Sequence, residues 1–256
     1  MRALLALLAT VVAAAAPTAP TTAAPAPPTS DDAERYRQCL DLARTDGPRA
    51  VARASEWRAN GGGIPARHCL AFAYGTTGDF AAASAELTAA ARAAETAHDP
   101  HAADLWGQAG NAALLAHDTP GALAALGSAT AVAGTEPVRL AALLTDRARA
   151  LVEANRTTEA KADLTRATSL DPSSATGWLL LATLDRRLAD LPAAERAILE
   201  AARREPADPD IALEAGNIAA AQGRIDLAKA EWNKVVAGAP GSDAATAAAK
   251  ALVLNP

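Results

Sequence analysis

The 256-residue chain is poor in aromatic residues, which make up 3% of it, and it has two cysteines and one methionine. It lacks the runs of valine, isoleucine, threonine and aromatic residues between turn signals that are typical of β-strands. Hydrophobic residues make up 50% of the chain, and most of these are alanine. Because alanine buries little area, a core built from it requires closely packed helices. The composition therefore predicts an all-α protein.

Motifs that would indicate catalysis or a bound cofactor are also missing. The sequence has no nucleophile elbow, no phosphate-binding P-loop and no zinc-protease motif. Its glycine-rich stretch, Gly61 to Gly63, follows no expected strand, so we interpret it as a turn. His98 and His101 flank Pro100 in an expected loop, and we interpret them as surface residues and not as metal ligands. We therefore expect no enzymatic activity, no cofactor and no metal.

Basic residues are too few for a nucleic-acid surface or a lipid anchor. The chain carries 24 lysine and arginine residues against 29 aspartate and glutamate residues, a formal net charge of -5. Nucleic-acid binding needs a basic face, and attachment to anionic lipid needs a polybasic segment. We expect no nucleic-acid partner, and membrane contact only if the N-terminal segment is retained.

The first 30 residues have the composition of an export signal followed by a linker. Arg2 precedes an apolar run, Ala3 to Ala16, which has the length of a signal-peptide core and is short for a membrane span. We assign residues 1–24 to a signal peptide cleaved between Ala14 and Ala26, with an uncleaved anchor as the alternative. Residues 17–30, rich in proline, threonine and alanine, are predicted to form an extended linker. The excess of arginine over lysine suits a GC-rich bacterial genome, so we expect a periplasmic or secreted protein.

Three prolines, Pro172, Pro206 and Pro240, lie 34 residues apart, and the segments that they close share one internal layout. A fixed period of this length is typical of stacked supersecondary units and not of one globular core. Such an array favours a binding surface over a catalytic pocket.

The layout resembles that of the tetratricopeptide repeat family, which has large residues at positions 4 and 24, small residues at 8, 20 and 27, and proline at 32. Trp106 and Trp178 occupy position 4 of their segments, and Gly110 and Gly216 occupy position 8. The resemblance is specific over about 105–242 and extends over most of residues 31–256. It implies a right-handed solenoid of about six helical hairpins, at 31–63, 64–102, 103–140, 141–174, 175–208 and 209–242, with a capping helix at 243–254.

The small positions let two antiparallel helices approach closely, and the large positions fill the space between neighbours. Asp118 and Asp190, each followed two residues later by proline, are predicted to cap second helices, and Ser242 the final helix. The units that begin at 64 and 103 have additional residues, which we place at the ends of second helices, before Pro100 and Pro137.

In this family the first helices of the units line a concave groove, where positions 2, 5, 9 and 12 face the ligand. The resemblance therefore implies a groove that contains His68, Phe72, Asn111, Arg149, Leu179, Thr183, Arg186, Leu213 and Asn217. An asparagine amide can both donate to and accept from an extended peptide backbone, and Asn111 and Asn217 each follow a glycine. The alternative is that these two amides satisfy only local backbone groups.

Cys39 and Cys69, the two cysteines, lie on the expected first helices of neighbouring units. In an oxidising compartment they are candidates for a disulfide, and the alternative is a pair of small buried side chains.

We predict an exported, non-catalytic scaffold of the bacterial envelope, which binds a peptide segment or helix of a partner protein in the concave groove. The alternative is an architectural subunit of an envelope complex, or a homo-oligomer, that uses its convex or terminal faces. An enzyme is a remote alternative.

Overall fold

The computed structural model describes residues 30–255, which form thirteen α-helices and, within that range, no strand. The all-α prediction is therefore confirmed. The predicted signal peptide and nearly all of the predicted linker lie outside the described residues. The helices are α1 (Ser30–Thr45), α2 (Gly47–Ala59), α3 (Gly63–Thr76), α4 (Phe80–Thr96), α5 (Ala102–Leu115), α6 (Thr119–Val132), α7 (Pro137–Glu153), α8 (Thr157–Leu170), α9 (Ala175–Arg187), α10 (Leu191–Arg204), α11 (Pro209–Ala221), α12 (Ile225–Gly238) and α13 (Asp243–Leu254).

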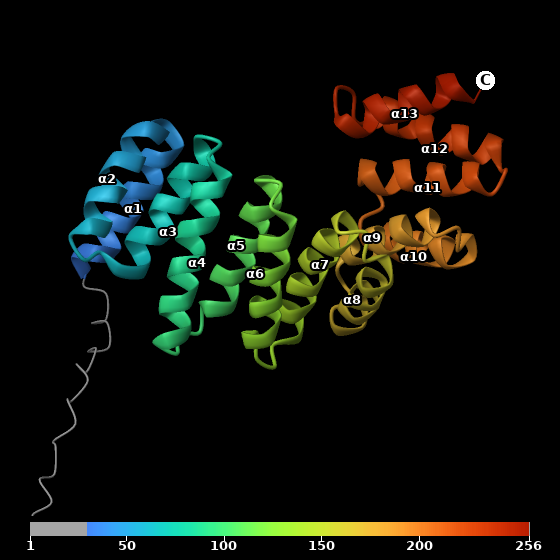
Figure 1. The fold of residues 1–256 in the computed structure, drawn as a ribbon. Coiled ribbons are helices and arrows are strands. Elements are labelled where there is room, and N and C mark those ends of the chain that lie inside the picture. Colours follow the sequence, from blue (N-terminus) through green and yellow to red (C-terminus); the bar gives the residue numbers. More distant parts are fainter. Residues whose placement is uncertain (1–29, 256) are drawn as a thin grey trace, which may run out of the picture.

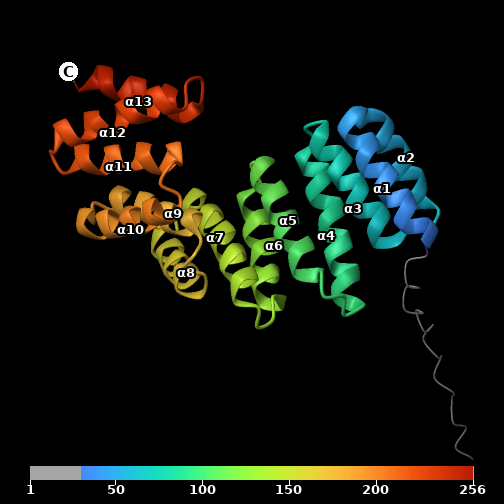
Figure 2. The ribbon, with the colours of Figure 1, turned by 180° about the vertical axis from the view of Figure 1, so that it is seen from behind.

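Consecutive helices pair as hairpins, and the hairpins stack into an elongated array that α13 closes at its C-terminal end (Figure 1). The direction of the helix axes changes along the array. In both views the axes of α11 to α13 run nearly perpendicular to those of α3 to α6 (Figure 1, Figure 2). None of the described helices is both long enough and apolar enough to cross a lipid bilayer. The predicted solenoid of helical hairpins with a C-terminal capping helix is confirmed.

Polar side chains cap the N-termini of three helices at the positions that the sequence predicts. The carboxylates of Asp118 and Asp190 accept hydrogen bonds from the backbone N–H groups of Gly121, at 3.0 Å, and Ala193, at 3.2 Å. The hydroxyl of Ser242 likewise accepts from the backbone N–H at the start of α13, at 3.0 Å. Each bond satisfies one of the N–H groups that a helix start leaves unpaired. The three predicted caps are therefore confirmed.

Two glycines at position 8 show why this position must be small. A Cβ added to Gly216 would lie 2.5 Å from Nε1 of Trp232, and one added to Gly110 would lie 2.4 Å from Cγ of Leu126. Trp232 and Leu126 occupy position 24 of the same two units and are almost wholly buried. The large residue at position 24 therefore fills the space that a side chain at position 8 would otherwise occupy.

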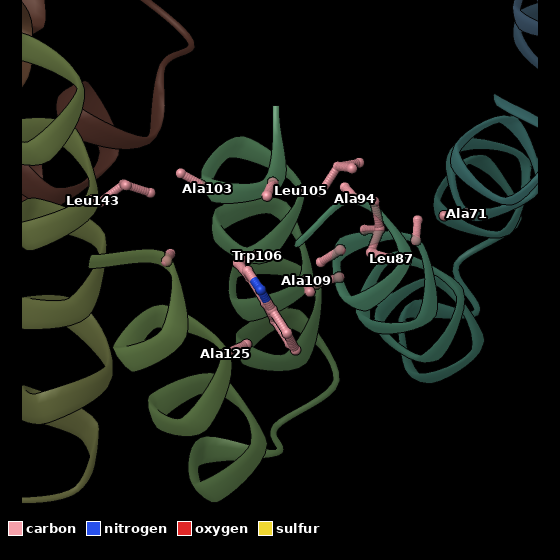
Figure 3. Packing of buried hydrophobic residues seen from close by; sticks show 14 of the residues in the cluster. Ala71, Leu87, Ala94, Ala103, Leu105, Trp106, Ala109, Ala125 and Leu143 are labelled. Carbon is pink, nitrogen blue, oxygen red and sulfur yellow. The ribbon is translucent and has the colours of Figure 1, made fainter. Parts of the chain in front are cut away.

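The core consists of several clusters of buried residues, which are rich in alanine and contain a few large side chains. One cluster runs from Ala71 of α3 to Leu143 of α7, and most of its members are alanine. Within it the indole of Trp106 lies close to the backbone of α5 and α6, with Ala109 and Ala125 beside it (Figure 3). Its Nε1 donates to Glu95 at the end of α4, at 3.1 Å. This cluster thus extends across neighbouring units and is not confined to one hairpin.

The longer units gain their additional residues in two different ways. Helix α4 has 17 residues, against 14 in α6, α8, α10 and α12, so the insertion before Pro100 lengthens a second helix, as predicted. The prediction for the insertion before Pro137 is wrong. Helix α6 keeps the usual length, and residues 137–140 form an additional turn at the start of the first helix α7. Pro137 begins this turn because a proline at the first helical position lacks only an N–H that would be unpaired there anyway.

A disulfide joins Cys39 of α1 to Cys69 of α3, with 6.2 Å between the two Cα atoms. Both residues are buried, and Tyr36, Leu70 and Trp57 pack around them. The bond therefore connects the first helices of the first two hairpins at the end of the array that has no capping helix of its own within residues 30–255.

We expect Ala194→Leu to lower the free energy of unfolding by about 1–3 kcal/mol, because Ala194 is wholly buried where α9 and α10 meet and a larger side chain overpacks this contact. The measurement is thermal and urea unfolding followed by circular dichroism. Ala162→Leu, at an exposed position of α8, is the matched control and should stay within about 0.5 kcal/mol of the wild type. Equal melting temperatures for all three proteins would contradict the packing described above.

Reduction of the disulfide should lower the free energy of unfolding by about 3–4 kcal/mol in the chain-entropy description, since the bond closes a loop between residues 30 apart in the sequence. Urea unfolding with and without reductant measures the difference. The double variant Cys39→Ala, Cys69→Ala is the control, and reductant should not change its unfolding. Two free thiols in the untreated protein purified from an oxidising compartment would exclude the bond.

Candidate functional site

The odd-numbered helices form the concave side of the array. Helices α1 and α3 pack against each other, and so do α5 and α7, α7 and α9, α9 and α11, and α11 and α13. Within residues 30–255, no comparable contact joins α3 to α5 or joins successive even-numbered helices. The array therefore curves toward its first helices, and the spaces between neighbouring first helices are where a ligand could enter. We call each such space a junction and name it by its two helices.

The α3–α5 junction contains a hollow of about 340 Å³. His68, Phe72 and Asn111, three of the residues predicted for the groove, line this hollow together. Its rim is apolar, because the side chains of Phe72 and Leu115 are 38% and 58% exposed. The hollow therefore offers carbon surface to an apolar side chain from outside.

The α7–α9 junction contains a second hollow, of about 350 Å³. Two more of the predicted residues, Arg149 and Thr183, line it, together with Val152, Leu180 and Arg187. This hollow differs from the first because it has charged side chains at its rim.

The two hollows occupy the same place in the repeat, two units apart. Leu87 forms part of the wall of the first hollow and Leu164 of the second, and both occupy position 24 of their units. Phe72 and Arg149 both occupy position 9. The hollows are therefore a property of the repeat geometry and not an isolated defect in packing.

A polar bridge fills the α5–α7 junction, which lies between the hollows. Nδ2 of Asn111 donates to Oδ2 of Asp146 at 2.8 Å, and Nη1 of Arg149 donates to Oδ1 of the same carboxylate at 2.8 Å. The amide of Asn111 is thus engaged with a side chain of the next unit. Asn111 also lines the first hollow, and an amide carbonyl oxygen can accept a hydrogen bond.

A second polar bridge fills the α9–α11 junction. Arg186 forms two hydrogen bonds with Glu214, at 2.6 and 3.1 Å, and the Glu214 carboxylate is almost wholly buried. Nδ2 of Asn217 donates to the same carboxylate at 3.2 Å, and its Oδ1 accepts from Nε1 of Trp232 at 3.2 Å. The predicted residues Arg186 and Asn217 therefore hold neighbouring helices together.

The two asparagines share a Gly-Asn sequence context but make different contacts. Position 24 is a tryptophan in the unit of Asn217, and the buried indole N–H needs an acceptor, which Asn217 provides. Position 24 is Leu126 in the unit of Asn111, so that amide is available to the next unit. Both amides bond to side chains, which differs from the local backbone groups considered as the alternative.

A hydrogen-bonded chain of three side chains crosses the first three first helices. The hydroxyl of Tyr36 lies 2.6 Å from Nδ1 of His68, and Nε2 of His68 lies 2.8 Å from Oε1 of Gln108. Burial raises the pKa of Tyr36, so the phenol keeps its proton and donates to Nδ1. His68 then donates from Nε2 to the amide oxygen of Gln108, which fixes the ring at the edge of the α3–α5 hollow.

The remaining predicted groove residues, Leu179 and Leu213, are partly buried and pack against the core clusters around α9 and α12. The nine predicted residues are therefore distributed over the two hollows, the two polar bridges and these two partly buried leucines. Sequence reasoning missed Gln108, Leu115 and Arg187, which lie at positions 6 and 13. A comparison of position 13 between units would have shown an apolar Leu115 where the two neighbouring units have the polar residues Thr76 and Glu153.

Elsewhere, charged side chains form ion pairs that join neighbouring helices. Nζ of Lys161 in α8 lies 2.6 Å from Oδ1 of the buried Asp185 in α9 and 3.1 Å from Oδ2 of Asp190. Hydrogen bonding to Asp185 raises the pKa of Lys161, and hydrogen bonding to Asp190 raises it further. Within residues 30–255, no cluster of three or more histidine, cysteine, aspartate and glutamate side chains is placed to hold a metal ion.

The family model named Tetratricopeptide repeat matches residues 145–184 and 179–244. No curated protein sequence matches the chain.

Solved structures with a similar fold cover most of this chain at low identity. PilW, a type IV pilus biogenesis factor, has a TM-score of 0.68 at 17% identity and covers 86% of this chain and 98% of its own. PilF from Pseudomonas aeruginosa has a TM-score of 0.64 at 15% identity and covers 88% and 100%. YrrB, described as a TPR protein with an unusual peptide-binding site, has a TM-score of 0.53 at 17% identity and covers 77% and 96%. The family match therefore shows tetratricopeptide repeats over residues 145–244, and the paired helices and the packing of Gly110 against Leu126 continue the same arrangement upstream of that range.

Proposed function

We propose that the protein is a non-catalytic scaffold that binds a segment of a partner protein against its concave face. The observation that carries the proposal is the pair of apolar hollows at equivalent junctions, the first with Phe72 and Leu115 exposed at its rim. Exposed apolar side chains beside a preformed hollow are typical of a surface that a partner covers. The likeness to YrrB, which is described as having a peptide-binding site, supports the same direction.

The scaffold acts in the bacterial envelope after export. The signal-like composition of residues 1–24 supports export, and the disulfide between Cys39 and Cys69 suits an oxidising compartment. The likeness to PilW, a type IV pilus biogenesis factor, gives a precedent for an array of this length in pilus biogenesis. PilW shares 17% identity with this chain.

A second proposal is an architectural subunit that assembles through its convex or terminal faces. Leu199 and Leu227 are exposed on the second helices α10 and α12, and Val253 and Leu254 are exposed at the end of α13. These residues are scattered singly or lie at the chain end, and none lines either hollow. Isolated surface apolar residues are normal in soluble proteins, so the concave face is the stronger site.

Photo-crosslinking from inside the cell can separate the two proposals. We expect a benzophenone amino acid at position 72 to form a covalent adduct with another protein, because Phe72 lies at the rim of the α3–α5 hollow. The same amino acid at positions 199 and 227 is the matched control, since these residues are apolar and exposed on second helices. Adducts that arise at 199 or 227 and are absent at 72 would favour the architectural proposal and reject the groove.

Export is tested by cell fractionation and by sequencing the N-terminus of the protein. We expect the mature chain to lie in the periplasm or the medium and to begin between residues 14 and 26, because the apolar run ends there and small residues follow. A chain that begins at Met1 in the membrane fraction would instead support an uncleaved anchor.

A further inference from the structure

Resting on the export that is part of the proposed function, we propose that Asn155 is an N-glycosylation site. Its side-chain amide receives an oligosaccharide from a polyprenyl diphosphate carrier once the chain has left the cytoplasm. Asn155, Arg156 and Thr157 form the acceptor triplet, which is asparagine, any residue except proline, and then serine or threonine. Asn155 is the one asparagine of six in the sequence that begins such a triplet. Short triplets are common in sequences, so the surroundings of this one decide whether it can act as an acceptor.

The triplet lies in the turn that joins α7 to α8 (Figure 1). Helix α7 ends at Glu153 and α8 begins at Thr157, so Asn155 and Arg156 lie outside both helices. Asn155 is exposed and has a φ of 58°. Acceptor asparagines lie in surface loops of exported proteins, because the carrier and the attached glycan are bulky. The position of Asn155 meets this requirement.

The turn itself does not require asparagine. The equivalent turns of four other units also contain a residue with a positive φ, namely Gly78, His117, Ala189 and Gly223. Asparagine tolerates this left-handed region better than most residues, which explains why it is accepted at position 155. Since glycine, histidine and alanine serve the same turn, the backbone conformation alone does not select the combination of Asn155 with Thr157.

The amide of Asn155 is free to react, because it makes no hydrogen bond within residues 30–255. In four other asparagines the amide nitrogen already donates to another group, namely Asn60, Asn111, Asn217 and Asn255. Glycosylation replaces one of the two hydrogens on this nitrogen, so at those residues it would compete with a bond of the fold. Asn233, the sixth asparagine, lies inside α12, and Val235 stands where the hydroxyl residue would be needed.

The hydroxyl of Thr157 also makes no hydrogen bond in the described part of the chain. The residue is half-buried and lines an open hollow of about 660 Å³ beside α8. Arg156, between the two acceptor residues, is paired with Glu159 of α8, with 2.6 Å between Nη2 and Oε2. A transferase that binds the hydroxyl by a hydrogen bond therefore meets a group without a competing partner.

The transfer changes no charge at the turn. Nδ2 of Asn155 forms a bond to the anomeric carbon of the first sugar, and the bond from that carbon to the diphosphate oxygen breaks. The diphosphate leaves with the electron pair, and the amide gives one proton to a base of the oligosaccharyltransferase. The product is a neutral amide that carries the sugar, and the step needs neither an oxidant nor a reductant.

A glycan at this turn is compatible with the proposed concave site. Asn155 lines neither the α3–α5 hollow nor the α7–α9 hollow. Because the residue is exposed, attachment of the sugar requires no rearrangement of the packed helices. We therefore expect the modified chain to fold as the unmodified chain does.

The test is mass spectrometry of the full chain, expressed in its own host and purified from the fraction to which it is exported. We expect the tryptic peptide of residues 150–156 to carry the added mass of one oligosaccharide. Asn155→Gln and Thr157→Ala should each lose this mass completely, whereas Thr157→Ser should keep it because the hydroxyl remains. Asn233→Gln is the matched control and should stay modified at Asn155.

An exported chain in which residues 150–156 have only the unmodified mass would overturn the inference and leave the proposed scaffold intact. Added mass that persists in Asn155→Gln would lie elsewhere in the chain and would overturn it as well. If fractionation finds the chain in the cytoplasm, the proposed export fails, and so does the glycosylation that depends on it. Equal melting temperatures of Thr157→Ala and Thr157→Ser exclude misfolding as the reason for a difference between these variants.

Discussion

The close approach of helix backbones at small residues is the constraint on which this structure depends. At Gly216 and Gly110 no side chain of any size could be added without displacing Trp232 or Leu126. Alanine serves the same purpose elsewhere, and it lets the chain build a core with very few aromatic residues. A core of this kind gains stability from many shallow contacts and not from a few large side chains. Neighbouring units must therefore stay in register, since each completes the packing of the next.

The register of the array decides which polar groups meet at the junctions. Position 6 of each first helix lies opposite positions 9 and 12 of the preceding unit, as the contacts of Asp146 with Asn111 and of Glu214 with Arg186 show. An acidic residue at position 6 closes its junction with a polar bridge. Leu180 occupies this position at the α7–α9 junction and makes no such bridge, and Gln108 at the α3–α5 junction is bonded to His68 instead. One repeat position thus determines whether a junction is bridged or hollow.

Much of the fold could be predicted from the sequence because it depends on local signals. The 34-residue period, the small positions and the capping residues Asp118, Asp190 and Ser242 each act within one hairpin. The additional turn of α7 was misplaced because a proline in a loop and a proline at a helix start look alike when the neighbouring helix ends are unknown. The junction contacts were not predictable in the same way, since Asn111 and Asp146 lie 35 residues apart and meet only when α5 and α7 of successive hairpins pack against each other.

The two Gly-Asn pairs show that the same two residues at the same repeat positions can have different structural roles. Asn217 is required by the indole of Trp232, so its amide belongs to the core of its own unit. Asn111 has no such neighbour and reaches across to the next unit, beside a hollow. The residue at position 24 therefore influences the polar groups of the concave face from the opposite side of the first helix. In an array of this kind the core and the concave face cannot vary independently, because each large side chain that is buried behind a first helix changes which polar groups remain available in front of it.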